Sequence, residues 1–162
     1  VRMEGILVPY IHGGGKIGVM VRAESPAGAI PEILAAAKDC ALQVAAMNPP
    51  YLKREDVPAA VLDEEKKIIL AQMAEDPKMA NKPEQVKEKI AAGKVGKYYG
   101  ENCLLEQAFV KENKETVQSY VDGVAKAAGT TIAITDFVRF ERGEGIEKKA
   151  DNFAEEIASM IK

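Results

Sequence analysis

The chain has 162 residues, of which 47% are hydrophobic and 29% are charged. These proportions are typical of one compact globular domain, or of one domain with an appendage, and they exclude wholesale disorder and fibrous repeats. The 22 basic and 25 acidic residues give a net charge of -3. This balance argues against a large nucleic-acid-binding surface, because phosphate recognition needs an excess of Lys and Arg.

The sequence contains no apolar run near the roughly 20 residues of a membrane helix, and the N-terminus has no secretory signal. We therefore expect no membrane contact. The two cysteines, Cys40 and Cys103, are far apart and lack metal-site spacing, which favours a reducing compartment over a disulfide framework or a zinc site. Because the first residue is Val1, we expect a processed or excised piece of a longer chain.

The first elements form a predicted β-hairpin. Residues 5–11 and 16–22 are short β-rich runs, and the glycines between them permit a tight reversal. Pro9 cannot donate to a strand ladder, which predicts an edge position or a bulge for the first strand. One face of the second strand presents Ile17, Val19 and Val21.

The next segment is predicted to be a helix that packs on this face of the strand. Its apolar residues recur at spacings of three and four, which indicates one helical stripe. Pro31 suits its first turn, and residues 48–50, Asn-Pro-Pro, end it. The predicted stripe consists of Ile30, Ile33, Leu34, Ala37, Ala41 and Val44, with Cys40 beside it as a core or boundary thiol.

The middle of the chain predicts an antiparallel helical hairpin. One helix spans residues 58–73 and a second runs from 83 toward 98, with prolines between them. The sequence leaves open whether this hairpin lies on the core or projects from it. The residues expected to face inward are Val61, Leu62, Ile68, Ile69 and Met73 in the first helix and Val86, Ile90 and Val95 in the second.

The last part of the chain predicts a helix over 114–128, with Gly129 as its stop, then a strand over 130–141 and a final helix over 148–161. In the strand, Asp136 shares the parity of Ile134 and Val138, which would place a carboxylate in the core. A bulge near Thr135 or an edge position would relieve this conflict.

Together these elements predict an α+β fold in which a small antiparallel three-stranded sheet is covered by helices. An antiparallel helical hairpin is inserted at about residues 58–99. We expect a core domain over residues 1–145 and a C-terminal helical module over 146–162.

Catalytic chemistry is poorly supported by the sequence. The Gly-Gly-Gly-Lys run at 13–16 is followed by Ile17, where a phosphate loop needs Ser or Thr. A single histidine, His12, cannot form a His-paired metal site. The interpretations of His12 that stay open are a plain turn residue and a contact in a binding surface. We predict no catalytic residue, no metal and no cofactor, and a binding module in place of an enzyme.

Several motifs in this order resemble the translation elongation factor Ts family, and they span nearly the whole chain. The resemblance is carried by YIHGGGKIGV at 10–19, CLLEQ at 103–107 and FVRFERGEGIEKK at 137–149. It implies the C-terminal half of the family's core, with its helical hairpin and C-terminal helix. It also implies that the N-terminal ubiquitin-associated-type domain and the first half of the core are missing.

In that family the protein is a guanine-nucleotide exchange factor for the GTPase elongation factor Tu and performs no covalent chemistry. The resemblance therefore implies docking on that GTPase and a part in GDP/GTP exchange during translation elongation. The alternative is a ribosome-associated or scaffold module that uses the hairpin without exchange activity. The residues expected to contact the partner are Tyr10, His12, Gly13, Gly14, Lys16, Phe153 and Ile157.

Self-association as a homodimer is also implied by the resemblance, and binding to a specific nucleic-acid sequence is not. The bacterial cytoplasm is the default location, with the chloroplast stroma and the mitochondrial matrix as alternatives. Residues 135–138 spell Thr-Asp-Phe-Val, as does a loop in the family's first core half that reaches toward the nucleotide. Their neighbours match a late sheet strand, so we interpret the spelling as coincidental.

Overall fold

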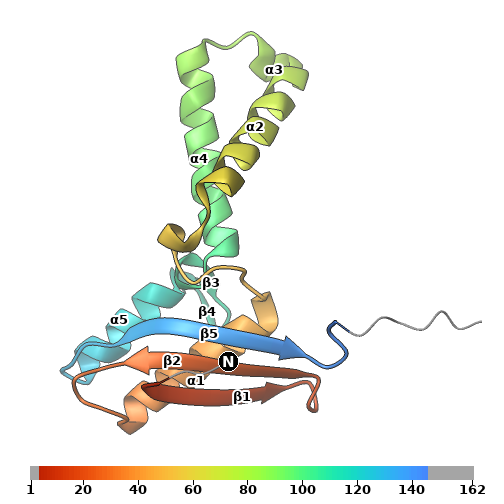
Figure 1. The fold of residues 1–162 in the computed structure, drawn as a ribbon. Helices are drawn as coiled ribbons and strands as arrows, with labels where there is room; N and C mark the ends of the chain where they lie inside the picture. The colour runs from red at the N-terminus through yellow and green to blue at the C-terminus, as the bar shows by residue number, and fades with distance from the viewer. Residues whose placement is uncertain (1–3, 146–162) are drawn as a thin grey trace, which may run out of the picture.

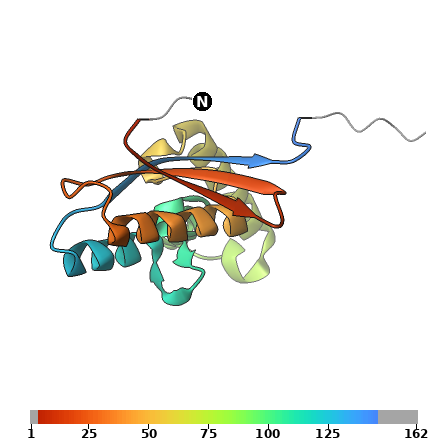
Figure 2. The same ribbon diagram turned by 90° about the horizontal axis from the view of Figure 1, so that it is seen from below.

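The computed structural model describes residues 4–145, which form a three-stranded antiparallel sheet with helices packed on one face (Figures 1 and 2). The strand order is β1-β2-β5, so the last strand pairs with the N-terminal hairpin, as predicted. The α+β fold is thereby confirmed. Its sheet layer and its covering helices are β1 (Ile6–His12), β2 (Ile17–Glu24), α1 (Pro31–Met47), α5 (Val117–Ala127) and β5 (Ala133–Glu141).

Strand β2 lies at the centre of the sheet and supplies the middle of the core. Val19, Val21 and Ala23 alternate toward α1 and are almost fully buried, as the period of two predicts. Helix α1 buries most of the predicted stripe, except that Leu34 is 38% exposed. Its neighbour Ile33 is fully buried, because consecutive helical residues are about 100° apart and cannot both face the sheet.

Both edge strands carry the irregularities that the sequence predicts. Pro9 lies in β1, which is an edge strand. In β5, Asp136 pairs with Arg22 and Ile134 pairs with Ala23. Thr135 is therefore the extra residue of a β-bulge, which turns Asp136 out to solvent.

The bulge also changes which aromatic side chain of β5 reaches the core. Beyond Thr135 the parity shifts by one residue, so Phe137 packs against the core and Phe140 is 57% exposed. The prediction that one face of the strand carries Ile132, Ile134, Val138 and Phe140 was therefore wrong for the two residues beyond the bulge. An inserted residue exchanges the two faces of every later residue of the strand.

The helical hairpin projects away from the sheet layer (Figure 1). It consists of α2 (Ala59–Glu75), the one-turn helix α3 (Pro77–Ala80) and α4 (Glu84–Asn102). Asp76 caps α3 by accepting a hydrogen bond from the Lys78 backbone N–H at 2.9 Å. The predicted hairpin is present, and α4 extends four residues beyond the expected end.

The contact between α2 and α4 is narrower than predicted. Its buried residues are Ile69, Met73 and Ala91, whereas Ile68 is 44% exposed and Val86 is 37% exposed. Two helices touch along one stripe each, and the small Ala91 is the one residue of α4 that the contact buries completely. The expectation that Ile68 and Val86 face inward was wrong for this reason.

A further correction concerns residues 114–116, which were expected to begin a helix but belong to a strand. This strand is β4 (Glu112–Thr116), which pairs with β3 (Ala108–Phe109) in a two-stranded sheet. Thr116 ends this strand and caps α5, since its Oγ1 accepts a hydrogen bond from the Ser119 N–H at 3.2 Å. Helix α5 therefore starts at Val117.

The end of α5 follows the prediction closely. Gly129 has φ +64°, and its N–H donates to the Lys126 carbonyl at 3.2 Å. The Thr130 N–H donates to the Ala125 carbonyl at 3.0 Å. This pair of bonds is a Schellman motif, which favours glycine at the left-handed position.

Polar contacts join the two short turns at the base of the hairpin to each other and to α4. The η1 turn (Arg54–Asp56) places Arg54 over the Tyr99 ring at 4.8 Å, and its Nη2 donates to Glu106 Oε2 at 2.7 Å. Glu106 belongs to the η2 turn (Leu104–Glu106) that follows α4.

The predicted helix over 148–161 and the proposed module over 146–162 lie outside the described residues, and the domain boundaries stay a prediction.

Candidate partner-binding surface

The β1-β2 turn is held in a backbone conformation that only glycine adopts readily. Gly13, Gly14 and Gly15 have φ values of +61°, +65° and +89°. The Lys16 N–H donates to the His12 carbonyl at 3.2 Å and closes the turn. A Cβ atom on Gly14 or Gly15 would meet nothing within 4 Å, so lack of space does not explain the glycines. They are required for their positive φ angles, and the tip of the turn is exposed.

Tyr10 and His12 form a pair at the root of this turn. The two rings lie 5.8 Å apart, and the Tyr10 hydroxyl is hydrogen-bonded to His12 Nδ1 at 3.0 Å. His12 is the last residue of β1, half-buried and paired with Ile17, so it lies beside the turn and not in it. Its Nδ1 is occupied by Tyr10, and no described residue pairs with its Nε2, which leaves that nitrogen for a partner.

The end of β5 lies against the same turn (Figure 1). The Arg142 N–H donates to the Lys16 carbonyl at 2.8 Å, and the turn after β5 is closed by a bond from the Glu144 N–H to the Glu141 carbonyl at 3.0 Å. We call residues 12–16 and 139–145 together the turn end. Sequence reasoning found the first segment but not the second, because nothing local indicates which strand end meets the turn.

The predicted contact residues are thus partly brought together. Tyr10, His12, Gly13, Gly14 and Lys16 lie at or beside the turn end, whereas Phe153 and Ile157 are outside the described residues. Among the five that the structure describes, Gly13, Gly14 and Lys16 are exposed, and Tyr10 and His12 are half-buried.

Residues 135–138 do not form an exposed loop. They lie within β5, where Thr135 is the bulge, Asp136 accepts a hydrogen bond from the Phe137 N–H and Phe137 packs against the core. A role in reaching toward a nucleotide would need a protruding segment, so this position supports the interpretation of Thr-Asp-Phe-Val as a coincidental spelling.

The face of the sheet opposite α1 carries a set of apolar side chains that the sequence analysis did not identify. The strand register places them on one face, since they alternate with the core residues of β1, β2 and β5. Ile11 is 67% exposed and Phe140 is 57% exposed. We call this set the outer sheet face; its members are Leu7, Pro9, Ile11, Met20, Val138 and Phe140.

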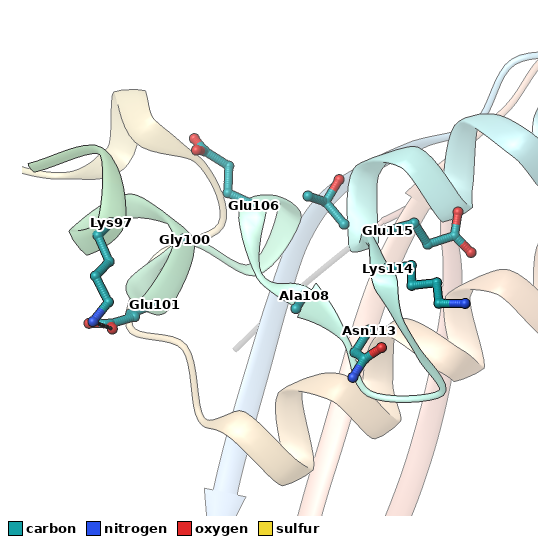
Figure 3. Close-up of a pocket in the computed structure, with 9 residues that line it drawn as sticks. Lys97, Gly100, Glu101, Glu106, Ala108, Asn113, Lys114 and Glu115 are labelled. Atoms are coloured by element: carbon teal, nitrogen blue, oxygen red, sulfur yellow. Dashed lines mark ion pairs between the residues drawn. The ribbon is translucent and has the colours of Figure 1, made fainter. Parts of the chain in front are cut away.

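A surface hollow of about 360 Å³ lies between the end of α4 and the β3-β4 loop. Lys97 and Glu101 form an ion pair at 3.4 Å on one side of it, and Lys114 and Glu115 lie on the other, so the charged groups do not converge on one point (Figure 3). This arrangement offers no acid-base pair for catalysis. Within residues 4–145 no group of three metal-ligating side chains occurs, and no helix has the length and apolarity to cross a membrane.

The two thiols are buried, and burial raises their pKa values. The pKa of Cys40 is raised to about 12, with the Asp39 carboxylate adding to the effect, and that of Cys103 to about 11, with Glu106 adding to it. Thiols with such pKa values are neutral near pH 7 and are poor nucleophiles. Both cysteines therefore act as core residues, as predicted for Cys40.

Residues 1–144 match the family model described as Elongation factor TS. The chain is 47% identical over 159 residues to an elongation factor Ts of Clostridium kluyveri, and 43% identical over 159 residues to that of Syntrophotalea carbinolica. A Clostridium perfringens elongation factor Ts is 45% identical over 157 residues.

These alignments cover 97–98% of this chain but only 50–51% of each relative. The chain thus spans about half the length of the curated relatives that it matches. The family model covers most of the 162 residues, including the helical hairpin and the turn end up to residue 144. The chain belongs to the elongation factor Ts family.

Proposed function

We propose that this chain binds the GTPase elongation factor Tu and takes part in guanine-nucleotide exchange during translation elongation as the docking part of the exchange factor. The observation that carries the proposal is the turn end, where a glycine turn with three positive φ values exposes Lys16 and lies next to the half-buried His12. Family membership supports the identity of the partner.

An exchange factor acts by thermodynamic linkage. It binds the GTPase more tightly when nucleotide is absent, and it weakens nucleotide binding by the same factor. A surface that only docks has equal affinity for both states and shifts nothing. The proposal therefore assigns docking to this chain and assigns the displacement of nucleotide to family residues that it does not contain.

The direct test measures binding and exchange separately. The purified chain is titrated into nucleotide-free elongation factor Tu by calorimetry, and release of a fluorescent GDP analogue is followed with the chain and with a full-length factor. We expect binding with little acceleration of release. Absence of binding would refute docking, and release as fast as with the full-length factor would refute the assignment of exchange to other residues.

The role of His12 is tested by His12→Ala. The variant should weaken docking by about tenfold, since a contact of the proposed interface is lost, while the melting temperature stays unchanged. Tyr10→Phe tests the positioning of the imidazole separately, because it removes the hydroxyl that holds Nδ1 and keeps the ring. Unchanged affinity of His12→Ala, or loss of the folded state, would argue against this role.

Phe153 and Ile157, which lie outside the described residues, are proposed as further contacts. The test is the double variant Phe153→Ala/Ile157→Ala, which should weaken docking without changing the core stability of residues 4–145. If the double variant and the unmodified chain bound elongation factor Tu with equal affinity, these two residues would not be part of the interface.

A second candidate function is self-association as a homodimer, and the outer sheet face favours it. Ile11 and Phe140 are large apolar side chains left more than half exposed, and contiguous exposed apolar surface commonly marks an interface. Light scattering should give twice the monomer mass, and Phe140→Asp should return the monomer. A monomeric unmodified chain would refute this candidate.

The helical hairpin supports the alternative of a ribosome-associated or scaffold module. It projects from the core (Figure 1) and exposes Ile68 and Val86. Cosedimentation of the purified chain with ribosomes, in the absence of elongation factor Tu, would favour this alternative over docking on the GTPase.

The proposed location is the bacterial cytoplasm, supported by the bacterial sources of the relatives. The chloroplast stroma and the mitochondrial matrix are the alternatives for organelle members of the family. Immunodetection in fractionated source cells distinguishes these compartments.

A further inference from the structure

Tyr10 and His12 lie on the same face of β1, because residues two apart in a strand point to the same side of the sheet. Val8, the preceding residue of this row, is buried in the core. Tyr10 pairs with Val19 of β2, and His12 pairs with Ile17. The Tyr10 hydroxyl is hydrogen-bonded to His12 Nδ1 at 3.0 Å. The row therefore leads from a core side chain to the imidazole beside the turn.

Tyr10 is the fixed member of this pair. Its half-buried ring packs against the hydrophobic core, whereas His12 is the last residue of β1 and borders the exposed glycine turn. The two rings are tilted by 37°, so the hydroxyl, and not a stacked pair of rings, is the directed contact. A tyrosine side chain also has only two torsion angles to fix. The hydroxyl of a core residue thus orients the imidazole.

The backbone of His12 is held as well. Its carbonyl accepts the hydrogen bond from the Lys16 N–H at 3.2 Å that closes the turn. Tyr10 is the one side chain bonded to the imidazole among residues 4–145. Both the backbone and the ring of His12 are therefore ordered before a partner arrives, which lowers the entropic cost of binding through this residue.

The bond to Tyr10 also decides which nitrogen of the imidazole carries a proton. The unprotonated nitrogen of imidazole is a stronger base than a phenol oxygen, so the favoured arrangement has the Tyr10 O–H donating to Nδ1. The proton of the neutral ring is then on Nε2. In the charged ring both nitrogens carry protons. Nε2 is consequently a hydrogen-bond donor in either state.

We propose that Tyr10 is the positioning residue of the docking contact: it holds His12 as a donor through Nε2, and the partner atom that meets this nitrogen is an acceptor oxygen. The proposal rests on the proposed docking function and adds the polarity of one contact. Acceptor oxygens of a protein belong to backbone carbonyls, side-chain amides, hydroxyls and carboxylates. Lysine and arginine side chains of the partner do not fit at Nε2, because they have donors only.

The first experiment measures the tautomer of the imidazole in the full chain. His12 is the one histidine of the sequence, so long-range ¹H–¹⁵N NMR correlations of the ring are assigned without ambiguity. The unmodified chain should show the Nε2–H tautomer at pH 8. Tyr10→Phe should show the averaged shifts of two exchanging tautomers, and Tyr99→Phe, which removes a hydroxyl at the base of the hairpin, should match the unmodified chain. An Nδ1–H tautomer, or identical spectra for Tyr10→Phe and the unmodified chain, would overturn the proposal.

The second experiment measures the affinity of the same proteins for nucleotide-free elongation factor Tu by calorimetry. Tyr10→Phe should bind about threefold more weakly, because the imidazole that makes the contact is no longer oriented. Tyr99→Phe should bind as the unmodified chain does. If Tyr10→Phe lowered the melting temperature but changed neither the tautomer nor the affinity, its hydroxyl would have a structural role alone and the proposal would be wrong.

The polarity of the contact is tested with His12→Gln and His12→Glu, which are nearly equal in size. The amide keeps N–H donors, whereas the ionised carboxylate only accepts. We expect His12→Gln to bind more tightly than His12→Ala, and His12→Glu to bind about tenfold more weakly than His12→Gln. Thermal unfolding checks that each variant is folded. Repeating the comparison at raised salt removes long-range effects of the added charge.

Equal or tighter binding by His12→Glu than by His12→Gln would show that the partner presents a donor, and would overturn the acceptor assignment while leaving docking intact. A difference that disappears at raised salt would overturn it too. Failure of the unmodified chain to bind would instead refute the proposed function, and the NMR measurement on the free chain would still decide the role of Tyr10. The two failures are therefore distinguishable.

Discussion

At the scale of single residues, the glycine turn gives the sharpest prediction of stability. Gly14 has φ +65° with open space around it, so Gly14→Ala introduces backbone strain without a clash. The free energy of unfolding should fall by about 1 kcal/mol. Urea unfolding followed by circular dichroism measures this change.

Gly93→Ala is the matched control for this substitution. Gly93 is an exposed residue inside α4, where its φ is not positive and a Cβ would also meet nothing within 4 Å. There alanine should stabilise the helix by up to about 1 kcal/mol. Opposite signs for the two variants support the dihedral argument, and equal signs would contradict it.

A second prediction at this scale concerns Gln43, which is fully buried in α1. Its Nε2 donates to Gln107 Oε1 and to the Ala108 carbonyl, both at 3.1 Å, and its Oε1 accepts from the Val110 N–H at 2.9 Å. Gln43→Leu would leave the buried Gln107 Oε1 without its donor and remove the two bonds to the backbone, so it should destabilise the fold by about 1 to 3 kcal/mol.

The control for Gln43→Leu is Gln118→Ala, because the bond of Gln118 to Asp122 is exposed. Its effect on the free energy of unfolding should stay within about 0.5 kcal/mol. A similar small effect for Gln43→Leu, measured by the same chemical denaturation, would show that the buried network contributes little.

The same residues show what the sequence could not predict. Apolar residues at spacings of three and four mark the buried stripe of α1. Gln43 is polar, and only the fold, which places residues 107–110 beside it, explains why it is buried. Likewise the strongly charged segment Glu112–Thr116 has no strand pattern and becomes β4 only by pairing with β3. Partners distant in the chain decide both cases, and tertiary context overrides local propensity.

At the scale of elements, local patterns predicted the sheet, α1 and the hairpin, and one conflict of parity predicted the bulge at Thr135. The glycine turn with His12 and Lys16 was predicted for the same reason, since its signal lies in consecutive residues. Arg142 was not predicted as a neighbour of Lys16, because strand register, and not spacing, brings β5 to that turn.

The hairpin has a small core of its own, so it should open separately from the sheet. Met73 is 2% exposed between α2 and α4, whereas Ile68 is 44% exposed. Met73→Ala should destabilise the hairpin by about 2 kcal/mol, and Ile68→Ala should have a much smaller effect.

Hydrogen exchange followed by mass spectrometry measures this difference segment by segment. Met73→Ala should speed exchange across residues 59–102 and leave β2 and α1 protected. Uniform acceleration over the whole described chain would mean that hairpin and sheet unfold as one unit, and equal effects of Met73→Ala and Ile68→Ala would contradict the observed burial.

At the scale of the whole molecule, the two buried thiols predict how stability depends on pH. Both thiols have pKa values raised from 9.0 in the folded chain, to about 12 for Cys40 and about 11 for Cys103. Above pH 9 the unfolded chain loses these protons and the folded chain keeps them. The thiol contribution to stability is therefore fully present below pH 9 and is lost as the pH rises toward 11 and 12.

The free energy of unfolding should accordingly fall between pH 8 and pH 10.5 by about 1 to 2 kcal/mol for each thiol. Tyr120 adds to this fall, because burial and its hydrogen bond to Asp39 also raise its pKa. The double variant Cys40→Ala/Cys103→Ala isolates the thiol part, since tyrosines and lysines titrate alike in both proteins. Its stability should decline less steeply with pH in urea titrations, and parallel declines would show that the thiols ionise equally in both states.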